Sequence, residues 1–173
     1  MTFERRFRLD KLPPLTFSKS VKIRQVYWRL DSSWSIRIRQ EDDPGDYRHT
    51  ITIKGPRSGS GRPEIRTAIF DGIAPIDRAA SLEILNNLLG SGKHHSIDKT
   101  RHYYEIGAVT WEIDEFHGPH KGLLIAEVHS QDESFIESIE VPAWAAHYEV
   151  TADPVYNNEN LAYEDDPTWI REK

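Results

Sequence analysis

The sequence contains no cysteine. A disulfide framework and a metal site with thiolate ligands are therefore both excluded. No apolar run approaches the ~18 residues that span a membrane, so no membrane segment is predicted. Acidic residues outnumber basic ones, 28 to 22, and a chain without a basic surplus is not expected to bind nucleic acid through its phosphates. A Gly-x-Ser-x-Gly sequence is absent too, which leaves no candidate for a covalent nucleophile.

The length of 173 residues fits one domain, since domains of roughly 100 to 200 residues can bury a full core. The N-terminal sequence MTFERRFRLD lacks the apolar centre of a secretory signal, so a cytoplasmic location is expected. The last residues are acidic and polar around Trp169. We expect a main domain over residues 1–162 and an acidic tail over residues 163–173.

Most of the chain alternates between apolar and polar residues, and this period of two is typical of half-buried β-strands. Turn-forming Gly, Pro and Asp residues separate the runs. The predicted strands are 3–9, 21–28, 33–40, 49–54, 63–70, 97–106, 109–116, 122–129 and 147–153.

One segment, residues 75–90, has the helical pattern. Leu82, Leu85 and Leu89 recur at helical spacing, and Gly90 is a typical C-terminal stop. A second, short helix is predicted near residues 134–139. Many strands in succession with about two helices indicate an α+β fold, with a mostly antiparallel sheet that closes into a barrel.

Charged residues share one face of several predicted strands, because successive side chains of a strand point to opposite faces. Glu112 and Asp114 alternate with Trp111 and Ile113, for example. The other charged rows are Glu4 with Arg6, Arg37 with Arg39, Arg62 with Glu64 and Arg66, Lys99 with Arg101, and Glu127 with His129; Lys54 lies with two threonines.

Two interpretations of these charged faces remain open. They can meet solvent while the apolar faces form a core, as in many antiparallel sheets. Alternatively, the predicted helix packs its leucines on an outer apolar face and the charged face of a closed barrel points inward. Enclosed like charges at ~4 Å repel by about 4 kcal/mol at an effective dielectric constant near 20. An inward face therefore favours a bound polyanion and a divalent cation, which together describe a metal-bound polyphosphate.

Several of these segments resemble the CYTH domain of the triphosphate tunnel metalloenzymes, which include class IV adenylate cyclases, thiamine triphosphatases and inorganic triphosphatases. The similarity extends over nearly the whole chain. It is most specific in WEIDEFHGPHKGLLIAEV, which resembles the long acidic hairpin of the family, and in EVTADPVYNNENLA, which resembles its closing signature. FERRF, SIRIR, TIK, RPEIR and IDKTR are similar to its shorter charged strands.

The resemblance implies a closed, eight-stranded antiparallel β-barrel, or tunnel, with a few flanking helices. It implies that basic residues bind a triphosphate and that acidic residues hold Mg²⁺ or Mn²⁺. The implied substrate-binding residues are Arg6, Arg37, Arg39, Lys54, Arg62, Arg66, Lys99 and Arg101. The implied metal ligands are Glu4, Glu127 and His129, and the implied catalytic residues, which support the metal or the attacking water, are Glu64, Glu112 and Asp114.

The sequence departs from the family pattern at four positions. Thr2, Arg66 and His129 stand where the family has glutamate, and Arg6 stands where it has lysine. Mg²⁺ prefers hard oxygen ligands, so the loss of carboxylates disfavours it, whereas histidine suits Mn²⁺ or another transition ion. The changes favour holding an anion over activating water.

Two other motifs carry no function in this interpretation. GSGKHH lacks the first glycine and the final Ser or Thr of a phosphate-binding P-loop, and its predicted helix precedes the loop. The histidines of FHGPH, His117 and His120, have no zinc-ligand spacing and are interpreted as ordinary loop residues.

Three functions follow from the resemblance and its departures. The first is a metal-dependent hydrolase of an inorganic or organic triphosphate. The second is a polyphosphate- or nucleotide-binding protein that has lost turnover, and the third is an adenylate cyclase. The expected partner is a small triphosphate or polyphosphate, with no nucleic acid and no membrane. The sequence leaves the oligomeric state, including a homodimer, open.

Overall fold

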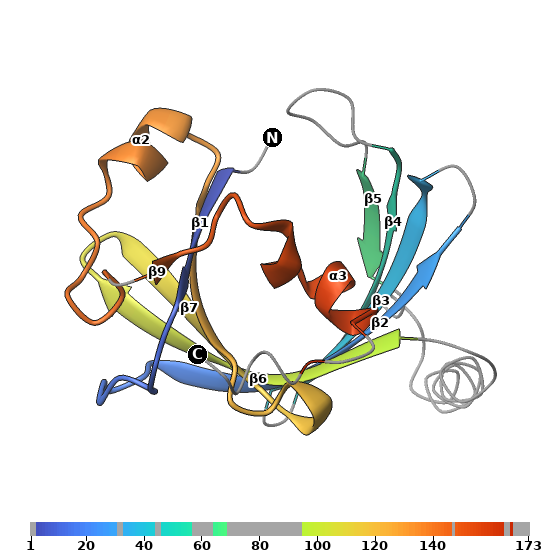
Figure 1. Ribbon diagram of the computed structural model, residues 1–173, viewed down its shortest axis with the longest axis horizontal. Helices are drawn as coiled ribbons and strands as arrows, with labels where there is room; N and C mark the ends of the chain where they lie inside the picture. Colours follow the sequence, from blue (N-terminus) through green and yellow to red (C-terminus); the bar gives the residue numbers. More distant parts are fainter. Residues whose placement is uncertain are drawn as a thin grey trace. The chain divides into compact units, whose positions relative to one another are not determined.

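The computed structural model consists mainly of antiparallel strands with a few short helices (Figure 1), which confirms the predicted mixture of elements. It describes residues 3–30, 33–43, 46–56, 64–68, 95–146, 148–164 and 167. The chain divides into two compact units. Unit 1 comprises Met1–Ile23 and Ile97–Lys173, and unit 2 comprises Arg24–Ser96.

Unit 1 contains the strands that carry four of the five acidic residues predicted for the site, namely Glu4, Glu112, Asp114 and Glu127. Their hydrogen-bonded order is β2-β6-β7-β8-β1-β9. The strands are β1 (Phe3–Arg8), β2 (Lys19–Arg29, which continues into unit 2), β6 (His95–Ile106), β7 (Val109–Phe116), β8 (Leu124–Ser130) and β9 (Tyr148–Glu149). Gly107 forms the β6–β7 turn with a φ of +60°, a conformation in which glycine avoids steric strain.

One face of this sheet forms the apolar core of unit 1. Trp111 and Ile113 of β7 are 1% and 0% exposed, and they belong to the same core cluster as Phe7. Helix α2 (Glu133–Ser138) confirms the predicted second helix and contributes Ile136 to this cluster. α2 contacts β1 and β8, and Figure 1 shows it beside β1. The alternation of the sequence therefore identified the core face correctly in this unit.

Unit 2 contains a second run of antiparallel strands. After β2 come β3 (Ser35–Asp43), β4 (Asp46–Lys54) and β5 (Glu64–Ala68), hydrogen-bonded in that order. Arg37 lies opposite Thr52, and Thr52 lies opposite Arg66. The helix predicted over residues 75–90 lies outside the described residues.

The C-terminal part of unit 1 differs from its prediction. Only Tyr148–Glu149 pairs as a strand, where residues 147–153 were predicted, and it pairs with β1. Two short helices follow, η3 (Pro154–Tyr156) and α3 (Asn158–Ala162), and η2 (Gly118–His120) connects β7 to β8. A side chain caps the N-terminus of each of these two helices: Asp153 accepts a hydrogen bond from Val155 N, and Asn157 accepts one from Glu159 N.

The predicted closed, eight-stranded barrel is wrong for the strands that the structure describes. Nine strands are hydrogen-bonded in the order β5-β4-β3-β2-β6-β7-β8-β1-β9, and within the described ranges no pairing joins β5 to β9. Both end strands are short, with five and two residues. Alternation indicates which side chains share a face, but it does not determine whether the two end strands meet. No helix in the described part of the chain is long and apolar enough to cross a membrane.

Candidate active site

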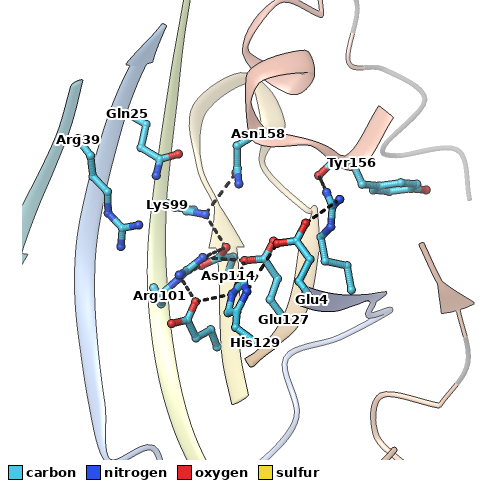
Figure 2. A network of polar contacts seen from close by, with 12 residues as sticks. Glu4, Gln25, Arg39, Lys99, Arg101, Asp114, Glu127, His129, Tyr156 and Asn158 are labelled. Atoms are coloured by element: carbon cyan, nitrogen blue, oxygen red, sulfur yellow. Dashed lines mark hydrogen bonds and ion pairs between the residues drawn. The ribbon is translucent and has the colours of Figure 1, made fainter. Parts of the chain in front are cut away.

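The sheet face of unit 1 opposite the apolar core carries a cluster of charged side chains (Figure 2). Strand register places charged residues directly opposite one another, because Cα partners on neighbouring strands share a face. The opposed pairs are Glu4 with His129, Arg6 with Glu127, Glu112 with Glu127, and Arg101 with Asp114. With Lys99 of β6, these residues bring together eight of the predicted site residues.

Asp114 lies at the centre of this cluster and is fully buried. Its Oδ1 accepts a hydrogen bond from Arg101 Nε at 2.7 Å, and its Oδ2 accepts from Arg101 Nη2 at 2.7 Å and from Lys99 Nζ at 2.5 Å. The Lys99 side chain is 0% exposed. Burial lowers the pKa of Lys99 more than the charge of Asp114 raises it. Asp114 therefore binds two buried cations with its own oxygens.

Arg101 also binds two further carboxylates with its guanidinium group. Its Nη2 donates to Glu127 Oε2 at 2.9 Å, and its Nη1 donates to Glu112. Burial by itself lowers the pKa of Arg101, but Asp114, Glu127 and Glu112 raise it well above the ordinary value. The planar guanidinium can satisfy three carboxylates at once, which a lysine ammonium could not do in the same geometry.

His129 lies among three carboxylates. Its Nε2 is 3.2 Å from Glu112 Oε2 and 3.7 Å from Glu127 Oε2, and its Nδ1 is 3.6 Å from Glu4 Oε2. Burial lowers its pKa, but the hydrogen bonds and charges of Glu112 and Glu127 raise that pKa to about 10. The imidazole is therefore a cation at neutral pH.

The two carboxylates that contact His129 are stabilised in their charged form. Burial raises the pKa of each carboxylate, but the hydrogen bond from His129 and the charge of Arg101 lower it by more than burial raises it. The result is a pKa below the ordinary value for Glu112 and far below it for Glu127. Both side chains are thus negatively charged over the physiological pH range.

Glu112, Glu127 and His129 also form a group that fits a divalent cation. Their potential ligand atoms all lie within 4.8 Å of one another. Two carboxylates and one imidazole suit Mn²⁺ well, and the carboxylates also suit Mg²⁺. His129 can bind a metal only as the neutral imidazole, so a bound cation would displace its proton and take over the neutralising role of the imidazolium. Asp114 is not part of this group, and its oxygens accept hydrogen bonds from Lys99 and Arg101.

Arg6 and Lys99 connect the cluster to the C-terminal helices. Arg6 forms an ion pair with Glu4 at 3.1 Å, and its Nη1 donates to the carbonyl oxygen of Tyr156 at 3.1 Å. Lys99 Nζ also donates to Asn158 Oδ1 at 3.2 Å. Neither Tyr156 nor Asn158 was assigned a role from the sequence, although both lie within EVTADPVYNNENLA. The Asp-Pro pair before Tyr156, a helix-start signal, was the available clue.

The remaining predicted site residues belong to unit 2. Arg37 donates from Nη2 to Thr52 Oγ1 at 3.1 Å, and Arg39 forms an ion pair with Glu41. The Nε atoms of Arg37 and Arg39 are buried without a hydrogen-bond partner in the described part of the chain. Lys54 is half-buried and Arg66 is exposed. Arg62 and the side chain of Glu64 lie outside the residues that can be described.

The charged face of this sheet thus combines buried basic side chains with a group of side chains that could hold a metal ion. The CYTH domain family matches residues 1–143. The chain therefore belongs to the CYTH domain family. This membership confirms the family resemblance of the sequence motifs.

The comparisons also find named relatives. The chain is 36% identical over 146 residues to an inorganic triphosphatase of Acetivibrio thermocellus, covering 84% of this chain and 83% of that protein. The crystal structure of another inorganic triphosphatase is similar in fold, with a TM-score of 0.60, 24% identity, and 96% and 97% of the two chains covered. A Pyrococcus horikoshii protein shares the fold at a TM-score of 0.50 and 21% identity, over 78% of this chain and 82% of that one.

Proposed function

We propose that the protein is a metal-dependent hydrolase of a triphosphate, with inorganic triphosphate as the first substrate to test. The single observation that carries the proposal is the charged cluster of unit 1, where Lys99 and Arg101 lie beside the metal-competent group of Glu112, Glu127 and His129. Such an arrangement suits phosphoryl transfer, because that reaction depends on positioning and on charge stabilisation more than on covalent chemistry. The relationship to an inorganic triphosphatase supports the choice of substrate.

Substrate binding is assigned to the basic residues. In unit 1 these are Arg6, Lys99 and Arg101, whose side chains are at most 9% exposed. Buried cations bind phosphate oxygens more strongly than exposed ones, because water screens them less. By family resemblance the proposal extends to the basic residues of unit 2, namely Arg37, Arg39, Lys54, Arg62 and Arg66.

The metal ligands in this proposal are Glu112, Glu127 and His129, with Glu4 close to His129. Mn²⁺ or Mg²⁺ at this position would neutralise phosphate charge and make a bound water more acidic. Glu112 is the carboxylate that we assign to orienting the attacking water, because its side chain is 20% exposed whereas that of Glu127 is 7% exposed. The side chain of Glu64, the other predicted catalytic residue, is not described.

Asp114 has a different role in the proposal from the one that the sequence suggested. Its oxygens accept three hydrogen bonds from Lys99 and Arg101. We therefore assign it to holding the two cations in place, as a positioning residue.

A second function, binding without turnover, is favoured by one specific observation. Glu112 and Glu127 are already paired with Arg101 and His129 within the chain itself. A cluster neutralised in this way could hold a polyphosphate without recruiting a metal ion. Adenylate cyclase activity has no comparable support among the contacts of the described residues.

The deciding experiment measures phosphate release from tripolyphosphate, ATP and thiamine triphosphate, each with Mg²⁺, with Mn²⁺ and with a chelator. The hydrolase predicts metal-dependent release from at least one substrate. It also predicts that Glu127→Ala lowers kcat far more than it lowers affinity for the substrate. Absence of release from all three, together with thermal stabilisation by tripolyphosphate in chelator, would overturn the hydrolase and support the binding protein.

A further inference from the structure

Asn158, the first residue of α3, places its side-chain amide against the cation cluster (Figure 2). Lys99 Nζ donates to its Oδ1 at 3.2 Å. An ammonium group has no acceptor, so this contact fixes which side of the amide faces Lys99. The Nδ2 group must then point away from Lys99 with two hydrogens to donate. Within the residues that the structure describes, Nδ2 has no hydrogen-bond partner.

The bond to Lys99 is not the only attachment of the C-terminal helices η3 and α3, because two other hydrogen bonds and a buried leucine also hold this segment. Arg6 Nη1 donates to the carbonyl oxygen of Tyr156 at 3.1 Å. His120, which is 3% exposed, lies with Nε2 2.7 Å from the carbonyl oxygen of Leu161. Leu161 itself is fully buried. The Lys99 contact therefore acts mainly on the orientation of the Asn158 amide.

We propose that Asn158 is a substrate-binding residue whose Nδ2 donates a hydrogen bond to an anionic oxygen of the triphosphate beside Lys99. The proposal rests on the proposed function and adds to it a contact from the C-terminal helix. A neutral amide suits this position. It accepts from the ammonium on one side and donates to an anion on the other, whereas a carboxylate could only accept.

Two other roles for Asn158 make different predictions. If Asn158 only fastens α3, any side chain that accepts a hydrogen bond from Lys99 preserves function. If its Oδ1 instead competes with a phosphate oxygen for Lys99, removing the side chain strengthens substrate binding. The substitutions Asn158→Asp and Asn158→Ala separate both roles from the proposed one.

Asn158→Asp keeps the acceptor for Lys99 and replaces the Nδ2 donor by a negatively charged oxygen. Asn158→Ala removes both groups. The matched control is Asn157→Asp, which makes the same charge change at the adjacent residue. Asn157 Oδ1 caps α3 by accepting from Glu159 N, and aspartate is an equally good cap. The control therefore leaves both the helix and the cluster contacts intact.

The measurements are the Kd for inorganic tripolyphosphate in the presence of chelator, by calorimetry, and KM and kcat with metal. We expect Asn158→Ala to weaken binding roughly tenfold, the effect of one lost hydrogen bond to a charged group. Asn158→Asp should weaken it on the order of 100-fold, because a carboxylate repels the phosphate at short range. KM should rise in parallel with Kd, and Asn157→Asp should stay within about twofold of the unchanged protein.

Three outcomes overturn the inference. If Asn158→Asp leaves the affinity for tripolyphosphate unchanged, Asn158 only fastens α3. If Asn158→Ala binds tripolyphosphate more tightly, the amide competes with phosphate for Lys99. If Asn157→Asp and Asn158→Asp lose the same affinity, the effect is a general one of charge. If the unchanged protein hydrolyses a triphosphate in any of these cases, the proposed function stands while this inference fails. If it neither hydrolyses nor binds triphosphates, both fail.

Discussion

Replacing Asp114 by asparagine tests whether this carboxylate holds the two buried cations. The change keeps the size of the side chain and removes its charge. The asparagine amide has one acceptor oxygen where Asp114 has two, and its NH₂ group must face Lys99 or Arg101, both of which can only donate hydrogen bonds. At least one donor of a side chain that is at most 7% exposed would then be left without an acceptor.

The expected cost is about 3 to 5 kcal/mol of unfolding free energy, the range for breaking a buried ion pair by removing one partner. We expect the upper half of that range, because Asp114 accepts three hydrogen bonds and is 0% exposed. For a chain of this length the melting temperature should fall by roughly 10 °C or more. Affinity for tripolyphosphate should fall as well, since Lys99 and Arg101 lose their fixed positions.

The assay is urea and thermal unfolding at pH 7, followed by tryptophan fluorescence and circular dichroism. Glu115→Gln is the matched control on the same strand, with the same loss of charge from a side chain that is 44% exposed. It should cost under about 0.5 kcal/mol. A loss below about 1 kcal/mol for Asp114→Asn would refute the reasoning, because the buried cations would then be stable without this carboxylate.

Two further predictions concern other charges of unit 1. His129→Glu replaces a cation by a carboxylate next to Glu112, so we expect a lower melting temperature without metal and a larger rise in melting temperature on adding Mg²⁺. If thermal-shift measurements show the same Mg²⁺-induced rise as in the unchanged protein, the assignment of metal ligands is contradicted. Arg5 binds Glu149 by two hydrogen bonds, of 3.0 and 2.7 Å, and these hold the pKa of Glu149 below its ordinary value. The pair therefore stabilises the protein above about pH 4.5, the ordinary pKa of this group, and this effect is lost as the pH falls through the lowered pKa. Its contribution should be under about 1 kcal/mol because the pair is exposed. Glu149→Gln should remove this pH dependence, and an acid-unfolding curve identical to that of the unchanged protein would contradict the assigned role of the pair.

Much of the cluster in unit 1 could be predicted from the sequence, because it depends on alternation. Trp111 and Ile113 lie in the core, and this places Glu112 and Asp114 on the opposite face, whatever the neighbouring strands are. The same rule placed Glu127 correctly. The pairing of β6, β7, β8 and β1 then places the charged rows of these strands next to one another. Where consecutive strands pair through short turns, only a few registers keep the apolar side chains in the core.

The division of roles among the carboxylates could not be predicted. Alternation places Glu112 and Asp114 on the same face of β7 and does not distinguish their roles. In the structure Asp114 is enclosed by Lys99 and Arg101, while Glu112 contacts His129. That difference depends on which long side chains reach across neighbouring strands. The contact between Asn158 and Lys99 was missed for another reason, since α3 has only five residues and offers too few turns for a helical period.

The charge balance of the unit 1 cluster connects these roles. Four carboxylates face four cations when His129 is protonated, as its pKa of about 10 requires at neutral pH. The members are Glu4, Glu112, Asp114 and Glu127 against Arg6, Lys99, Arg101 and His129. A triphosphate alone would leave this cluster strongly negative, and a divalent cation alone would leave it positive. Because the two ligands carry opposite charges and partly neutralise each other, each should strengthen the binding of the other. Such coupling is what a metal-dependent triphosphatase requires, and a binding protein that takes up polyphosphate without metal would lack it.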